Sequence, residues 1–217
     1  MQFKVLFKMK EKNYLQDLSD IKNIMNRSTR FLSLSGLSGI LAGIYALIGA
    51  YLGKTALQNA GFYNYSQNTI NPNNLEFKLV GIALGVAFLS IITAYILTKK
   101  KAKKQDVRIW NTTTKRLLFH FMIPLLTGGI FSLILLHQGL YGFVAPATLI
   151  FYGLAVLNAS NYTISNVKYL GIAQIILGLI AMNYIGYGLY FWAIGFGVFH
   201  IIYGVLMYFV VEKKDLN

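Results

Sequence analysis

Hydrophobic and polar positions along the chain separate into long blocks. Uncharged apolar runs of about 20 residues, the length that a helix needs to cross a bilayer, alternate with polar or charged segments. The runs are continuous rather than alternating, which favours helices over the strands of a membrane barrel. The pattern therefore predicts an all-α, polytopic transmembrane helical bundle. The six expected spans are 31–53, 78–98, 117–136, 139–158, 169–186 and 188–210.

The segments between the spans divide the chain into further parts. Very short connections, at 137–138 and near 187, make spans 3–4 and spans 5–6 tight helical hairpins. The first 30 residues have the apolar spacing of an amphipathic helix lying in the inner interface, with docking on a soluble partner as the alternative. Translation starts at Met1 or Met9. The parts are the N-terminal segment 1–30, the first hairpin 31–98 with its outer loop 54–77, the basic linker 99–116, spans 3–6 in 117–210, and the tail 211–217.

Positive charge is concentrated in a few of these segments. Residues 1–30 hold seven Lys and Arg, and the linker 99–116 holds eight, out of 20 in the chain. The positive-inside rule then predicts that both termini and this linker are cytoplasmic. The formal net charge of +13 comes without any nucleic-acid-binding motif, so its expected partners are the bilayer and its anionic headgroups. The candidate lipid contacts are Lys99, Lys100, Lys101, Lys103, Lys104 and Arg108.

Small residues form a stripe along the first span. Close backbone approach drives helix association in lipid, where burying leucine gains little. The stripe therefore predicts a packing seam, and a similar set in span 2 (Ala83, Ala87, Ser90 and Ala94) makes span 2 the expected neighbour, with a homo-oligomer or a membrane protein partner as the alternative. The seam consists of Ser35, Gly39, Ala42, Ala46, Gly49 and Gly53.

An internal repeat is a second hypothesis from the glycine positions. Four residues recur at a fixed offset of 49 positions, and each group closes a hairpin. Spans 3–4 and 5–6 would then be parallel copies. The matched sets are Gly129, Gly139, Leu140 and Tyr141, and Gly178, Gly188, Leu189 and Tyr190.

The spans contain little that could perform chemistry. All seven acids lie outside them, the chain has no cysteine, and the sequence matches no catalytic motif that we recognise. We therefore expect no catalytic residue, metal or cofactor. His200, near the middle of span 6, is either a hydrogen-bonding group between helices or a functional group. A polar pocket would combine His200, Gln174, Tyr152 and Tyr203, and an outer aromatic belt would combine Tyr51, Tyr141, Tyr187, Tyr190 and Trp192.

The run NRSTRFLSLSGLSGILAGIYALIGAYLGK resembles the first span of small, uncharacterised bacterial integral membrane proteins with about six transmembrane helices. This resemblance implies a plasma (inner) membrane location in a bacterium and carries no activity with it. Three functions follow as hypotheses. The leading one is a non-catalytic accessory, regulatory or scaffolding membrane component. The alternative is a small transporter or channel-like protein for a neutral or hydrophobic solute, and the third is a membrane enzyme or haem protein that uses His200.

Overall fold

The computed structural model describes residues 35–60, 75–104, 109–163 and 166–209, and these residues form helices and no β-strand. The predicted all-α class is therefore confirmed for the described chain. The N-terminal segment 1–30, with Met1 and Met9, and the tail 211–217 lie outside the described residues.

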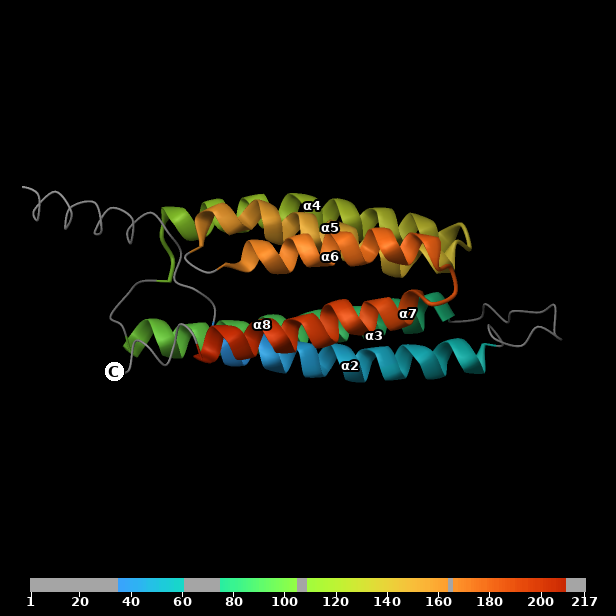
Figure 1. Cartoon of the computed structure of the whole chain (residues 1–217), viewed down its shortest axis with the longest axis horizontal. Coiled ribbons are helices and arrows are strands. Elements are labelled where there is room, and N and C mark those ends of the chain that lie inside the picture. The colour runs from blue at the N-terminus through green and yellow to red at the C-terminus, as the bar shows by residue number, and fades with distance from the viewer. Residues whose placement is uncertain (1–34, 61–74, 105–108, 164–165, 210–217) are drawn as a thin grey trace, which may run out of the picture.

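The helices form two layers (Figure 1). One layer holds α4 (Thr112–His137), α5 (Tyr141–Ala159) and α6 (Val167–Asn183), with α5 packed on both neighbours. The other holds α2 (Gly36–Asn59), α3 (Leu75–Lys104) and the last span, with α2 packed on both neighbours. A 3₁₀ turn, Ser160–Tyr162, follows α5.

The last span is one continuous helix with an irregular centre. It begins as α7 (Gly188–Trp192), continues as a π-helical segment (Ala193–Phe199), and ends as α8 (His200–Met207). A π-helix bonds each residue to the fifth residue along rather than the fourth, and it commonly marks a functional position.

Five helices of the described chain are long and apolar enough to cross a membrane, with the last span counted as Gly188–Met207. The exception among the six expected spans is α6, an apolar helix of 17 residues. At about 1.5 Å per residue, α6 is about 26 Å long, a little short of a hydrocarbon core of about 30 Å.

The helices also run past the predicted span ends. α2 continues to Asn59, and α3 continues to Lys104, where the sequence suggested loop and linker. Lysine is a good helix former, and its long stem can lie along apolar surface while its ammonium group reaches water. The charged residues therefore do not mark where these helices end.

α4 and α5 form a hairpin of packed helices, whereas α6 and the last span share a short connection but lie in different layers. After α4, the N–H of Leu140 bonds the carbonyl of Leu135 at 2.9 Å, and the N–H of Gly139 bonds that of Leu136 at 3.0 Å. Gly139 has a φ of +73°, so this is a Schellman end, which favours glycine. In the α6–α7 connection the positive φ belongs to Gly186, at +101°, rather than to Gly188. The glycines that the repeat matched, Gly139 and Gly188, therefore have different backbone roles.

α2 packs on α3, as the stripes predicted, and its backbone also comes close to that of the last span. A Cβ added to Gly39 would lie 3.1 Å from the Cα of Gly204, and one added to Gly43 would lie 2.6 Å from the carbonyl oxygen of Gly197. On α3, a Cβ added at Gly81 or Gly85 would meet nothing within 4 Å. The stripe of small residues predicted the contact with α3 but not the close backbone contact with the last span.

Candidate functional site

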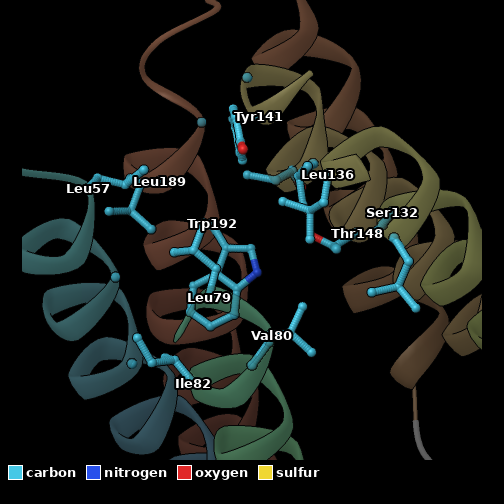
Figure 2. A pocket seen from close by; sticks show the side chains of 18 of the residues that line it. Leu57, Leu79, Val80, Ile82, Ser132, Leu136, Tyr141, Thr148, Leu189 and Trp192 are labelled. Atoms are coloured by element: carbon cyan, nitrogen blue, oxygen red, sulfur yellow. The ribbon is translucent and has the colours of Figure 1, made fainter. Parts of the chain in front are cut away.

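A partly enclosed cavity of about 370 Å³ lies between the two layers, at the end of the bundle where α4 turns into α5. Figure 2 shows side chains from both layers around it. We call it the interlayer cavity. Its volume falls within the range of small-molecule sites, about 300–1,000 Å³. Its apolar walls include Leu57, Leu79, Val80, Ile82, Leu136 and Leu189, and its small residues include Gly49, Gly53, Ala83, Gly129, Gly142 and Ala145.

The described lining of the interlayer cavity carries no charged side chain. Its side chains with polar atoms are Ser132, Tyr141, Thr148 and Trp192. The hydroxyl of Thr148 donates to the carbonyl of Ala145 at 2.8 Å, within its own helix. The cavity is therefore suited to a neutral, largely apolar molecule.

Trp192 projects from the end of α7 into this space. The tip of its ring lies against α2, where a Cβ added at Gly49 would be 3.9 Å from its Cη2 atom. Its ring also contacts that of Phe196, with ring centroids 4.9 Å apart. Figure 2 shows the indole nitrogen directed into the cavity. Trp192 was expected in an outer aromatic belt, and in the structure it lines the interlayer cavity.

A hydrogen bond crosses between the layers beside the cavity. The hydroxyl of Tyr141, at the start of α5, donates to Oε1 of Glu76, in the first turn of α3, at 3.3 Å. Tyr141 also lines the cavity, and Figure 2 shows its hydroxyl directed toward the cavity interior. This bond joins the two walls of the cavity, α5 and α3.

Three of the four predicted pocket residues meet in a polar cluster elsewhere in the bundle. Nδ1 of His200 lies 3.0 Å from the carbonyl oxygen of Gly195, and Nε2 lies 2.8 Å from the hydroxyl of Tyr152. Nε2 of Gln174 donates to the same carbonyl at 2.8 Å. Neither these three residues nor Tyr203, the fourth, lines the interlayer cavity.

The hydrogen bonds fix the form of His200. A carbonyl oxygen only accepts, so Nδ1 must carry the proton, and Nε2 then accepts from the Tyr152 hydroxyl. Both ring nitrogens of His200 are in hydrogen bonds. Nε2 could bind haem iron only if its hydrogen bond with Tyr152 were broken. Because Tyr152 comes from α5, Gln174 from α6 and His200 from α8, the cluster links the two layers.

The other two histidines lie apart from this cluster. His120 stacks on Tyr162 with ring centroids 4.9 Å apart, and His137 is exposed at the end of α4. Within the described chain, no three His, Asp or Glu side chains are grouped as metal ligands.

The predicted seam residues are divided among several neighbours. Gly39 faces the last span, and Gly49 contacts Val86 of α3. A Cβ added to Gly53 would lie 3.4 Å from a methyl group of Leu189. Ala46 is buried, Ala42 is half-buried, and Ser35 precedes the first turn of α2. Gly49 and Gly53 also line the interlayer cavity.

The candidate lipid-contacting lysines lie in the last turns of α3. Lys99, Lys100, Lys103 and Lys104 are exposed, and Lys101 is half-buried. Arg108 lies outside the described residues.

The sequence hypothesis missed the interlayer cavity and its polar lining. A usable signal was the depth of Trp192, which falls inside the last span, beyond Tyr187 and Tyr190. Ser132 and Thr148 were similarly visible as isolated polar residues within uncharged runs.

Comparison with known proteins gives no match to a family model, a curated protein or a solved structure.

Proposed function

We propose that this protein is an integral membrane protein that holds a hydrophobic molecule in the interlayer cavity without transforming it. The observation that carries the proposal is the cavity itself, which has about 370 Å³ of space between apolar walls. The groups best suited to chemistry, His200 and Tyr152, bond each other outside this cavity. This proposal adopts the hydrophobic-solute hypothesis but moves its site from the polar cluster to the interlayer cavity.

The proposed topology has six crossings, with both termini and the basic linker in the cytoplasm of a bacterial cell. Its support is the antiparallel course of the helices in Figure 1. Three basic segments lie at one end of the bundle. They are the end of α3 with its lysines, the start of α4 with Lys115 and Arg116, and the start of α6 with Lys168. The interlayer cavity lies toward the opposite end, and therefore in the outer half of the membrane. Local thinning of the bilayer at modest cost accommodates the short α6.

Two matched glycine substitutions test the cavity. Gly129 lines it and is exposed, and a Cβ added there would meet nothing within 4 Å, so Gly129→Leu adds bulk at the cavity without a clash at Cβ. Gly85, on α3, has the same free surroundings and does not line the cavity. Gly85→Leu is therefore a control for size, helix propensity and apolar surface.

The measurement is native mass spectrometry of protein purified gently in native lipid. We expect a defined hydrophobic molecule on the wild type and on Gly85→Leu, and at least a tenfold smaller bound fraction on Gly129→Leu, an estimate based on a steric block worth about 1.4 kcal/mol or more. Equal occupancy in all three proteins would contradict the proposal, as would the absence of any bound molecule.

A scaffolding or regulatory role is the second candidate, and the exposure of α3 favours it. None of the apolar window of α3 is buried within the chain, and its Gly81, Ala83, Gly85 and Ala87 are exposed. Small residues on a lipid-facing helix allow close approach of another helix. Gly81→Leu would then release a membrane partner or a second copy that co-purifies with the wild type. A partner retained by Gly81→Leu and Gly85→Leu alike would contradict this role for α3.

A further inference from the structure

The interlayer cavity contains a hydrogen-bond donor that the protein does not use. The indole nitrogen of Trp192 is directed into the cavity (Figure 2), and it has no hydrogen-bond partner within the described part of the chain. Trp192 is half-buried, and its indole N–H can only donate, so in an apolar cavity it favours a ligand with an acceptor atom. The wall opposite Trp192 offers Thr148, but the described structure has no hydrogen bond between these two residues.

Placing this N–H group in an apolar cavity costs free energy unless a ligand accepts a hydrogen bond from it. In hydrocarbon an unpaired polar group loses the hydrogen bond that water would have provided. The remaining lining is mostly Gly, Ala, Leu, Val and Ile, and none of the described lining is charged. A charged ligand would have no counter-charge here, whereas a pure hydrocarbon would leave the indole N–H unpaired.

We infer that the molecule held in the interlayer cavity is a neutral lipid whose carbonyl oxygen accepts a hydrogen bond from Nε1 of Trp192. This inference rests on the proposed function and adds the chemical class of the ligand to it. The apolar body of the lipid lies among the leucine and glycine residues of α2–α5, and its carbonyl oxygen is held at the depth of Trp192. Trp192 thus contributes to the selection among hydrophobic molecules, together with the hydroxyl of Ser132, which also lines the cavity and has no hydrogen-bond partner among the described residues.

The first test compares two probes of equal chain length, a long-chain methyl ester and the corresponding alkane. Both are offered to protein in detergent micelles, and bound probe is counted by native mass spectrometry. The quantity measured for each variant is the ratio of bound ester to bound alkane. Because partitioning of the probes into the micelle is the same for every variant, it cancels when these ratios are compared. We expect Trp192→Phe to lower this preference about 3- to 10-fold, the range of a single hydrogen bond.

Trp110→Phe is the matched control. Trp110, the other tryptophan of the chain, is exposed and does not line the cavity, so its replacement should leave the ester preference unchanged. If the preference is the same in the wild type and Trp192→Phe, the carbonyl assignment is overturned while the proposed function stands. If neither probe binds the wild type, both fail.

A second measurement keeps Trp192 in place and does not depend on how Trp192→Phe folds. In Trp110→Phe, Trp192 is the single tryptophan, and the ultraviolet resonance Raman band sensitive to hydrogen bonding at the indole N–H reports on it alone. We expect the band to shift when the ester probe is added and to stay in place with the alkane. No difference between the two probes would overturn the assignment.

Discussion

Gly36 and Gly204 contact each other backbone to backbone. A Cβ added to Gly36 would lie 2.5 Å from the carbonyl oxygen of Gly204, and a Cβ added to Gly204 would lie 2.6 Å from the carbonyl oxygen of Gly36. These distances are too short for any real side chain, so both positions require glycine. Since close van der Waals contact is the main force that holds helices together in lipid, this pair joins the first and last described helices of the chain.

Gly204→Ala should therefore destabilise the protein. The added methyl group gains about 1 kcal/mol of helix propensity, but overpacking against the backbone of α2 costs about 1–3 kcal/mol. Because backbone atoms limit relaxation on both sides, we expect the cost to prevail and the thermal midpoint in detergent to fall. Gly81→Ala is the control, since an added Cβ there meets nothing within 4 Å. Equal midpoints for the two variants would show that α2 and α8 are not in this contact.

Removing the Tyr152 hydroxyl should weaken the link between the layers. Tyr152→Phe would leave Nε2 of the buried His200 without its 2.8 Å partner. An unpaired buried acceptor costs about 1–3 kcal/mol, which should lower the thermal midpoint. Tyr95→Phe, at an exposed tyrosine of α3, should have no such effect. A Tyr152→Phe protein as stable as Tyr95→Phe would argue against the hydrogen bond.

The Tyr141–Glu76 hydrogen bond should slow exchange of the bound molecule. It joins α5 to α3 beside the interlayer cavity, so Tyr141→Phe should let the two walls separate more easily. We expect the dissociation rate of the methyl ester probe to rise about 2- to 10-fold, corresponding to about 0.5–1.5 kcal/mol for one hydrogen bond. Time-resolved displacement by unlabelled probe gives this rate. Glu76→Gln keeps an acceptor oxygen and should have a smaller effect, and the opposite order would contradict the proposed role.

The orientation in the membrane can be read with single cysteines, because the natural chain has none. Gln58→Cys, near the end of α2, should react with a membrane-impermeant maleimide in intact spheroplasts. Lys103→Cys, in the last turn of α3, should react only after the membrane is permeabilised. Both positions are exposed in the bundle, so the difference would report sidedness. Labelling of Lys103→Cys in intact spheroplasts would reverse the proposed topology.

The course of the chain could be predicted from the sequence because it depends on local patterns. Long apolar runs specify helices, and the short segment around Gly139 can only close a hairpin. The pairing of α2 with the last span could not be predicted in the same way. Gly36 and Gly204 are far apart in sequence, and a stripe of small residues specifies a face of a helix without naming the helix that covers it.

The candidate site was predicted in part, for a similar reason. Deep polar residues in apolar runs pointed to His200, Gln174 and Tyr152, and the structure brings these together by hydrogen bonds. The interlayer cavity was missed because a space between helices depends on how two layers meet. In the sequence, a glycine beside a cavity cannot be told from a glycine in a tight helix contact. The neighbouring residues Gly128 and Gly129 show this, because Gly129 borders open space whereas Gly128 lies against Phe151.

The π-helical segment Ala193–Phe199 sets the rotation between the two halves of the last span. Winding one extra residue into a helix turns everything beyond it by about 100° relative to a continuous α-helix. That offset lets Trp192 face the interlayer cavity while Gly204, farther along, faces α2. The same seven residues wound as a regular α-helix would lack this offset, and Gly204 would turn by about 100° relative to Trp192. The span could then present either its tryptophan or its glycine to the correct neighbour, but not both.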